Sequence, residues 1–274
     1  MDVSRSAGAV RRFEMGEGLT LTLIERGEAT SKCTVLLLHG GAGICSVTGL
    51  ADHLSARARV LAPIHPGFDE MPRPEWFDSV GDLATAYLDV LDELDLSEVL
   101  VIGISLGGWI AAEMALRDNH GRIGGLVLIG PVGIRANDPR EIEEAIDVDR
   151  AEFVRRIFHD PDAHARFVAH RAKSRTEPKS NVPMLRLYGG KPYMHDPKLR
   201  RRLRRVTVPV LVIWGECDQI TPLEYGLVYA QAFPRARFQP IADTGHMPQV
   251  ESLEATLGVI AEFITTELPH IAPW

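Results

Sequence analysis

The stretch that most constrains the fold is an apolar run from Val99 to Ile104, which leads directly into Ser105 and a glycine-flanked turn. The run has no polar alternation and is rich in β-branched residues, a pattern typical of a strand buried on both faces. Residues 106–117 contain good helix formers and no proline, which predicts a helix. The chain therefore passes from a buried strand into a helix within a few residues.

A Gly-x-Ser-x-Gly sequence occupies this turn, with Gly103 and Gly107 on either side of Ser105. Such a turn between a strand and a helix holds the serine in a strained backbone conformation and exposes its hydroxyl. The two glycines have no Cβ atoms that could clash across so tight a bend. The helix N-terminus directs amide groups and a positive dipole toward whatever the serine attacks. We therefore identify Ser105 as a candidate nucleophile.

Other apolar runs alternate with helical patterns along the chain. Strands are expected at residues 34–38, 59–64, 125–129, 208–214 and 237–241, after an edge hairpin at 13–15 and 19–25 that follows a loose lead-in over 1–12. Helices are expected at residues 50–56, after the N-cap Ser79, at 223–233 and at 251–266. Because these strands have continuous rather than alternating apolar residues, the fold class is α/β, with a parallel sheet covered by helices on both faces.

The alternation of strands and helices stops after Pro131. Residues 134–205 are charged and mostly helical in pattern, with candidate helices at 141–146 and 152–158. We predict an α/β core of residues 1–133 and 206–274, and a helical lid of residues 134–205 over the C-termini of the strands. The arginine-rich run at 200–205 is expected to be a solvated helix face.

The overall charge and the cysteines limit the classes of function. A formal charge of −7 argues against a nucleic-acid partner. No apolar run reaches the roughly 18 residues that span a bilayer, and residues 1–12 lack the apolar core of a secretory signal. Three widely spaced cysteines have neither metal-ligand nor disulfide spacing, so a reducing cytoplasm is the simplest location. We expect a cytoplasmic monomer or homodimer that acts on a small molecule.

A serine hydroxyl needs a neighbouring base to take its proton, and histidine suits this role near neutral pH. Of the ten histidines, His246 lies in a glycine-bearing loop after the last expected strand. The C-terminal ends of parallel strands meet on one side of a sheet, which is the side of Ser105. His39 also ends a strand, but it begins a Gly-Gly loop in which an imidazole more often braces the turn. His246 is therefore the candidate base.

The imidazole in turn needs a buried acceptor that fixes its tautomer. Asp218 closely follows the apolar run that ends at Trp214, again on the side of Ser105. Glu216 and Asp243 are the rival carboxylates, although a loop carboxylate close to a histidine in sequence is usually a turn-former. The resulting order of serine, acid and histidine is the one expected around such a serine turn.

Acyl transfer also develops an oxyanion, which amide donors stabilise best. We expect one donor to be the amide of Leu106, at the start of the helix after the nucleophile. The other is expected to be the amide of Gly41, in the loop Gly40-Gly41-Ala42, where the backbone can approach the substrate.

The chain resembles the α/β-hydrolase family over nearly its whole length apart from the predicted lid. The segments that carry the resemblance are His39-Gly40-Gly41, His65-Pro66-Gly67-Phe68, Gly103-Ile-Ser105-Leu-Gly107-Gly108, Trp214-Gly215-Glu-Cys-Asp218 with Pro222, and Gly245-His246. The resemblance implies an eight-stranded sheet with a helical lid inserted after the sixth strand. It also implies that the protein uses no metal and no organic cofactor.

Single positions separate the branches of this family. Epoxide hydrolases and haloalkane dehalogenases use an aspartate where this chain has Ser105. The glycine-rich loop and Gly130-Pro-Val-Gly133 resemble carbon–carbon bond hydrolases of ring-cleavage products, which usually carry a polar residue before the serine and a tryptophan after the histidine. Ile104 and Met247 occupy those places here. Cofactor-independent perhydrolases and small esterases are similar around Ser-Leu-Gly-Gly.

We therefore predict a serine hydrolase that cleaves an ester, thioester or lactone through an acyl-enzyme. The alternatives are a carbon–carbon bond hydrolase acting on a vinylogous diketone, and a non-catalytic ligand receptor on the same fold. Several apolar side chains near the motif loops or in the predicted lid are expected to line the substrate pocket, although each would also fit packing between lid and core. They are Phe68, Trp109, Met184, Tyr188, Met194 and Met247.

Overall fold

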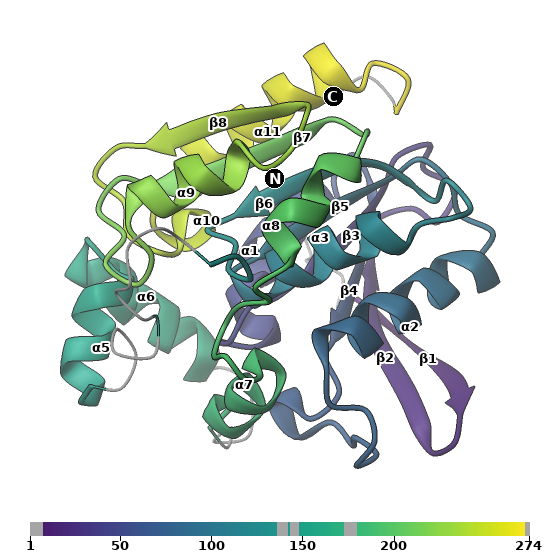
Figure 1. Cartoon of the computed structure of the whole chain (residues 1–274), viewed down its shortest axis with the longest axis horizontal. Helices are drawn as coiled ribbons and strands as arrows, with labels where there is room; N and C mark the ends of the chain where they lie inside the picture. Colours follow the sequence, from purple (N-terminus) through teal and green to yellow (C-terminus); the bar gives the residue numbers. More distant parts are fainter. Residues whose placement is uncertain (1–7, 136–141, 143–147, 173–179, 272–274) are drawn as a thin grey trace, which may run out of the picture.

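One eight-stranded sheet forms the centre of the molecule (Figure 1). The computed structural model describes residues 8–135, 142, 148–172 and 180–271. The strands are β1 (Ala9–Gly16), β2 (Leu19–Arg26), β3 (Thr34–Leu38), β4 (Arg59–Ile64), β5 (Val99–Ile104), β6 (Ile123–Ile129), β7 (Val210–Gly215) and β8 (Ala236–Ile241). Their order is β1-β2-β4-β3-β5-β6-β7-β8. The pairs β1–β2 and β2–β4 are antiparallel and all others are parallel, so the predicted α/β fold is confirmed.

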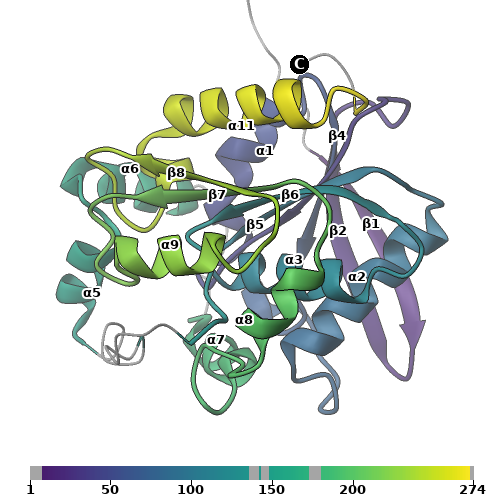
Figure 2. The ribbon, with the colours of Figure 1, turned by 45° about the horizontal axis from the view of Figure 1, so that its top comes forward.

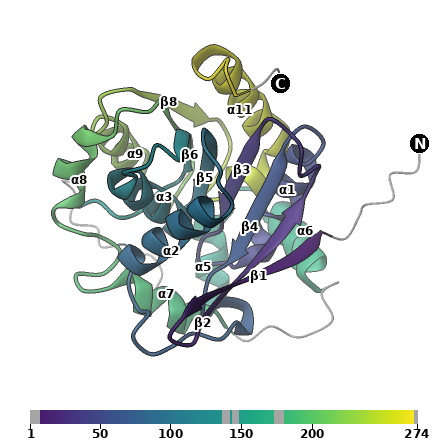
Figure 3. The same ribbon diagram turned by 90° about the vertical axis from the view of Figure 1, so that its right-hand side faces the viewer.

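Helices cover both faces of the sheet (Figure 2). The helices α2 (Val80–Glu93), α3 (Leu106–Arg117) and α9 (Leu223–Ala230) lie on one face, and α1 (Thr48–Leu54) and α11 (Leu253–Glu267) lie on the other, as Figure 3 also shows for α1, α2, α3 and α11. Successive side chains of a strand point to opposite faces, so each central strand contributes to two cores. In β3, Leu36 and Leu38 pack with the α2–α3 side, whereas Val35 and Leu37 pack with the α1–α11 side.

Some boundaries differ from the prediction. The lead-in expected over residues 1–12 was too long, because β1 begins at Ala9 and pairs with β2. Only Phe13 of this edge strand is buried, so its sequence lacks the apolar pattern that marks the inner strands. The last helix is divided at Ser252 into α10 (Pro248–Glu251) and α11.

A helical insertion lies between β6 and β7 in the chain. It contains α5 (Arg150–Ile157), α6 (Pro161–Ala172), α7 (Val182–Gly189) and α8 (Leu199–Arg202), and the last is followed by a 3-10 turn over Leu203–Arg205. The helix expected at 141–146 lies outside the described residues, apart from Ile142. The insertion leaves and rejoins the core at one place, because Gly133 donates to Met194 O at 3.0 Å and accepts from the Asp196 amide at 2.9 Å.

Two short 3-10 turns, Ile44–Ser46 and Phe68–Glu70, follow β3 and β4. Helices α5, α6 and α7 lie on the side of the sheet toward which the parallel strands run (Figure 1). Across the described ranges of the chain, no helix combines the length and apolar character needed to cross a membrane.

Candidate active site

Ser105 lies in the sharp turn between β5 and α3. Its backbone has φ 52° and ψ −113°, a conformation that a residue with a side chain rarely adopts. The Ser105 amide donates to Ile129 O of the neighbouring strand at 2.9 Å, which fixes the turn to the sheet. A Cβ atom on Gly103 would lie 2.3 Å from Gly107 O, so no other residue fits where the turn folds back on itself. The predicted strand–turn–helix geometry around the serine is therefore present.

The structure brings Ser105, His246 and Asp218 together from three separate loops. His246 Nε2 lies 3.2 Å from Ser105 Oγ, and His246 Nδ1 lies 2.7 Å from Asp218 Oδ2. His246 and Asp218 are each 7% exposed, whereas Ser105 is half-buried and remains accessible. These three side chains form an unbroken hydrogen-bonded chain from the hydroxyl to a buried carboxylate.

The surroundings of Asp218 define which nitrogen of the imidazole carries the proton. Asp218 Oδ1 accepts from the amides of Ile220 and Thr221 at 2.8 and 2.9 Å, and Oδ2 accepts from the Thr221 hydroxyl at 2.9 Å. A carboxylate with three such donors acts as an acceptor toward the ring, so His246 Nδ1 carries the hydrogen. The lone pair of Nε2 then faces the Ser105 hydroxyl, as a general base requires.

Close backbone packing holds the loops of Asp218 and His246 side by side. A Cβ atom on Gly215 would lie 1.9 Å from Gly245 O, so only glycine permits this approach. The Cys217 amide also donates to Thr244 O at 2.8 Å. The two loops follow the neighbouring strands β7 and β8, and this is why residues 28 positions apart can share a hydrogen bond.

The loop after β3 lies against the serine turn. A Cβ atom on Gly40 would be 3.0 Å from Ser105 Cβ. The Gly40 carbonyl accepts from His39 Nδ1 at 2.8 Å and from the Gly43 amide at 3.1 Å, and is therefore directed into its own loop. Across a trans peptide the next N–H points the opposite way, so the Gly41 amide is directed away from these partners. The Leu106 amide lies in the first turn of α3, where N–H groups have no intrahelical acceptor.

A buried histidine pair supports this loop from below. The amide of His65 donates to His39 Nε2 at 3.1 Å, and His65 Nε2 lies 2.9 Å from His39 O. The remaining ring nitrogen, His65 Nδ1, lies 2.6 Å from the Tyr87 hydroxyl. Burial lowers the pKa of His39 to about 4 and the pKa of His65 well below its ordinary value. Both imidazoles are therefore neutral and support the loop through hydrogen bonds. Among the described hydrogen bonds of His39, none is to Ser105, as a base for that hydroxyl would require.

The rival carboxylates lie elsewhere. Glu216 and Asp243 are both exposed, whereas Asp218 is buried against the imidazole. Of the three carboxylates in these loops, only Asp218 contacts His246 among the described hydrogen bonds.

Three of the expected pocket residues lie around the loop after β4. Phe68 is fully buried, with its ring centroid 5.2 Å from that of His39 and 6.0 Å from that of Tyr188. The Tyr188 hydroxyl donates to Pro66 O at 2.9 Å, and Met184 lies against Gly67. These contacts pack α7 onto the core, and a contact with substrate stays a prediction for all three residues.

The other three expected pocket residues are buried. Trp109 lies against Gly133, and Met194 O accepts from the Gly133 amide. Met247 packs in a separate small cluster with Phe158 and Ala163 of the insertion. For these residues too, the structure shows packing between insertion and core, and the substrate contact stays a prediction.

Two residues at the site were not predicted from the sequence. Thr221, three positions after Asp218, matches the local pattern in which an aspartate accepts from nearby N–H and O–H groups, so its spacing was an available signal. Glu251 accepts from the amides of Gly245, His159 and Asp160. A single glutamate in a helical sequence usually faces solvent, and no local pattern marked Glu251 as half-buried.

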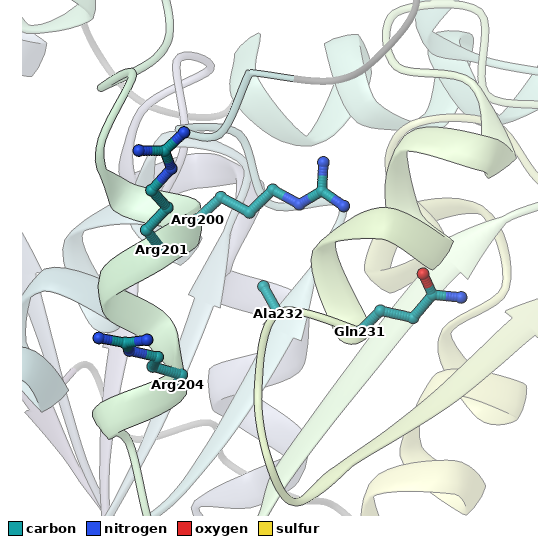
Figure 4. A pocket seen from close by; sticks show the side chains of 5 residues that line it. All are labelled: Arg200, Arg201, Arg204, Gln231 and Ala232. Atoms are coloured by element: carbon teal, nitrogen blue, oxygen red, sulfur yellow. The ribbon is translucent and has the colours of Figure 1, made fainter.

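The arginine-rich run lies away from these residues. Arg201, Arg204 and Arg205 are exposed, as expected of a solvated face, whereas Arg202 turns inward and donates to Glu113 Oε1 at 2.7 Å. A surface hollow of about 490 Å³ lies beside the run, and Figure 4 shows Arg200 extending across it toward the segment of Gln231. Its lining residues are Arg200, Arg201, Arg204, Gln231 and Ala232. None of them belongs to the predicted site.

No group of three or more His, Cys, Asp or Glu side chains within the described residues is arranged to hold a metal ion. The candidate site is thus a serine, a histidine and an aspartate next to a glycine-rich loop.

Comparison with known proteins gives concordant results. The family model described as the alpha/beta hydrolase fold matches residues 34–253. A 2-hydroxy-6-oxononadienedioate/2-hydroxy-6-oxononatrienedioate hydrolase of Cupriavidus pinatubonensis is 26% identical, over 84% of this chain and 86% of that protein. A 2-hydroxy-6-oxo-2,4-heptadienoate hydrolase of Pseudomonas putida is 25% identical, over 94% and 97% of the two chains.

Solved structures show the same fold. An esterase from Exiguobacterium antarcticum superimposes with a TM-score of 0.77 at 18% identity, covering 94% of this chain and all (100%) of the other. A 2-hydroxy-6-oxo-6-phenylhexa-2,4-dienoate hydrolase from a Rhodococcus strain has a TM-score of 0.76 at 22% identity, covering 94% and 99%. At these identities the likeness concerns the fold alone.

Proposed function

Because the chain belongs to the alpha/beta-hydrolase family, we propose that this enzyme is a serine hydrolase with Ser105 as nucleophile, His246 as base and Asp218 as the residue that orients His246. The observation that carries the proposal is the continuous hydrogen-bonded chain through the three side chains, at 3.2 and 2.7 Å. The strained backbone of Ser105, which presents the hydroxyl at the start of α3, supports the same role.

The proposed chemistry has two steps. Ser105 Oγ attacks a carbonyl carbon while His246 Nε2 takes the hydroxyl proton, and the carbonyl oxygen becomes an oxyanion. The amides of Gly41 and Leu106 stabilise that oxyanion. His246 then gives the proton to the leaving group, and a water molecule, deprotonated by the same imidazole, hydrolyses the acyl-enzyme to a carboxylic acid.

For the substrate, we propose first a carbon–carbon bond next to the ketone of a vinylogous 1,5-diketone. Both relatives described above are named as hydrolases of 2-hydroxy-6-oxo acids with two or more double bonds, and the second name places them at positions 2 and 4. Cleavage of such a bond makes carbon the leaving group, and this is feasible because the electron pair delocalises into the second, conjugated carbonyl. His246 would then protonate carbon rather than oxygen.

The ester, thioester or lactone predicted from the sequence becomes the second candidate. It is favoured by Ile104, which is 2% exposed and packs in the apolar core, and by Met247, which packs against Phe158. The resemblance to carbon–carbon bond hydrolases implies a polar residue and a tryptophan at these two places. Ester cleavage requires no conjugated carbonyl in the substrate, because the leaving alkoxide takes its proton directly on oxygen.

We further propose that the helical insertion α5–α8 forms the lid of this site. A Cβ atom on Gly41 would lie 2.8 Å from Leu185 Cδ2, so α7 is in contact with the proposed oxyanion loop. The amide of His246 donates to Ile157 O at the end of α5. These contacts support the division into a core of residues 1–133 and 206–274 and a lid of residues 134–205.

One experiment tests the chemistry and the substrate class together. The enzyme is treated with a fluorophosphonate probe, and kcat/KM is measured for p-nitrophenyl butyrate and for a 2-hydroxy-6-oxo-dienoate. We expect labelling at Ser105, higher kcat/KM for the dienoate, and a loss of at least about 10³-fold in the folded Ser105→Ala variant. Higher kcat/KM for the ester would favour the second candidate. Labelling elsewhere, or undiminished turnover by Ser105→Ala, would refute the mechanism, and ligand binding without turnover would indicate a receptor.

A further inference from the structure

The carboxylate of Glu251, at the end of α10, is a shared acceptor for two loops. Its Oε1 accepts from the amide of Gly245, the residue just before the proposed base, at 3.0 Å. Its Oε2 accepts from the amides of His159 and Asp160 at 2.9 and 3.0 Å. The latter two residues form the turn between α5 and α6 of the helical insertion. One side chain thus connects the insertion to the loop that carries the imidazole.

The same two loops also touch directly. The amide of His246 donates to Ile157 O at 2.7 Å. A Cβ atom on Gly245 would lie 2.3 Å from Ile157 O and 2.9 Å from the His159 nitrogen, so the loop backbone lies flat against the turn of the insertion. A shift of residues 157–160 would therefore move residues 245–246 with it.

The environment of Glu251 suggests more than surface capping. Burial raises the pKa of its carboxyl, and the amides of Asp160, Gly245 and His159 act in the opposite direction by stabilising the ionised form. Across the described part of the chain, no arginine or lysine forms an ion pair with this carboxylate. Three backbone amides, together with the electrostatic effect of the His159 side chain, therefore stabilise the ionised form of this half-buried carboxyl.

We propose that Glu251 is a positioning residue, which holds the His246 imidazole in line between Asp218 and Ser105 by fixing the His246 loop to the α5–α6 turn. The inference rests on the proposed function, in which His246 is the base. The imidazole is hydrogen-bonded through both ring nitrogens, at 3.2 Å to Ser105 and 2.7 Å to Asp218, so a small rotation of the ring would lengthen at least one of these contacts. Misplacing a catalytic group by about 1 Å lowers a rate by about 100-fold, so a loop anchor of this kind affects turnover directly.

The same proposal defines the role of the insertion more closely. The positioning contact comes from the α5–α6 turn, whereas α7 contacts the Gly41 loop through Leu185. The two halves of the insertion would then act on different parts of the reaction, the base and the oxyanion site.

The test compares Glu251→Gln and Glu251→Ala with Glu254→Gln, a matched change in the first turn of α11 at a side chain that is 89% exposed. Gln keeps the size of the side chain but offers only one acceptor oxygen, so one of the two loops loses its partner. We expect kcat for p-nitrophenyl butyrate to fall about 10-fold for Gln and about 100-fold for Ala, at nearly unchanged KM. The Glu254→Gln variant should match the wild type.

A spectroscopic readout separates positioning from stability. The proton between His246 Nδ1 and Asp218 should give a downfield proton NMR signal, assigned by its loss in Asp218→Ala. We expect the signal to shift or broaden in both Glu251 variants and to stay unchanged in Glu254→Gln. This readout does not depend on turnover, so it tests the inference even if Ser105→Ala shows that the proposed hydrolysis is wrong.

The inference is overturned if both Glu251 variants keep the wild-type imidazole signal and the wild-type kcat, whatever the change in melting temperature. That result would mean that Glu251 stabilises the fold but does not position the imidazole. If Glu251→Ala fails to fold, Glu251→Gln alone serves as the test. Gln has nearly the volume of Glu, and its one carbonyl oxygen can still accept from the amide of either Gly245 or His159.

Discussion

The imidazole rings of His39 and His65 lie with their centroids 3.8 Å apart, and the backbone amide of His65 donates to the ring nitrogen Nε2 of His39 at 3.1 Å. Both side chains are fully buried. Protonating His39 would place a hydrogen on the nitrogen that accepts this bond, and a charge next to the second ring. The pair therefore supports the loop of Gly40 and Gly41 only while both rings are neutral.

This pair predicts a specific loss of stability in mild acid. Burial holds the pKa of His39 at about 4, below its ordinary 6.5, and lowers that of His65 as well. Between those two pH values the unfolded chain binds protons that the folded chain excludes. The contribution of the neutral histidine pair to the free energy of unfolding is therefore fully present above pH 6.5 and is lost as the pH drops toward 4. We expect the free energy of unfolding to decrease by up to about 1.4 kcal/mol per pH unit for each histidine.

The measurement is urea unfolding at a series of pH values across this window. In the His39→Asn variant, the free energy of unfolding should change less steeply with pH, by about the 1.4 kcal/mol per pH unit expected of one histidine. His53→Asn, at an exposed histidine, should keep the wild-type pH dependence. An unchanged slope in His39→Asn would contradict the assignment.

Asp218→Asn should reduce kcat by about 10⁴-fold without unfolding the protein. The amide removes the negative charge that stabilises the imidazolium, and its NH₂ group must face either His246 Nδ1 or the donors of Ile220 and Thr221. The measurement is steady-state kinetics with far-UV circular dichroism as a control for folding. Thr221→Val removes only one of the three donors to the carboxylate and should reduce kcat less. A loss of kcat below about 10-fold in Asp218→Asn would exclude Asp218 as the carboxylate that orients His246.

Gly41→Ala should reduce kcat/KM because its new Cβ would lie 2.8 Å from Leu185 Cδ2. Because this methyl group is the end of a flexible side chain, Leu185 can turn aside, and we expect a loss of only about 10-fold or less. The double variant Gly41→Ala with Leu185→Ala has room for the added methyl group and should recover most of the activity. Without recovery, the loss would have to come from the backbone of the loop rather than from its contact with α7.

Asp69 and Asn181 should show a strong energetic coupling. Asp69 Oδ1 accepts from Asn181 Nδ2 and the Asp69 amide donates to Asn181 Oδ1, both at 2.9 Å, while Asp69 Oδ2 accepts from the Ile44 amide at 2.8 Å. A double-mutant cycle with alanine, followed by urea unfolding, is expected to give a coupling energy of about 1–2 kcal/mol. The exposed pair Arg237 and Glu262 is the control, with less than about 1 kcal/mol. Equal couplings for the two pairs would contradict the prediction.

Much of the sheet could be predicted because its inner strands are buried on both faces. The runs around Val35 and Val101 are apolar without interruption, and that pattern depends only on neighbouring residues. The edge strand β1 has one buried residue, Phe13, and depends on its pairing with β2, so its start at Ala9 was missed. Ser252, where the last helix divides, lies within a sequence that by itself favours one continuous helix.

The candidate catalytic residues could be named because local patterns mark them. The glycines around Ser105 reflect a turn that admits no side chain, and Asp218 and His246 each follow the end of a strand. Their roles in catalysis stay predictions until the proposed experiments are done. What the structure adds is that the three side chains meet, at distances that a linear sequence does not contain.

By itself, the sequence determined the strand–helix alternation and the serine turn, and it marked the three candidate residues, because each depends on steric and burial preferences of nearby residues. Only the tertiary structure decided that Glu251 joins the His246 loop to the turn at His159, and that His39 and His65 form one neutral pair. Such partners are brought together by the packing of separate elements, and no local residue preference encodes a hydrogen bond across 92 positions of the chain.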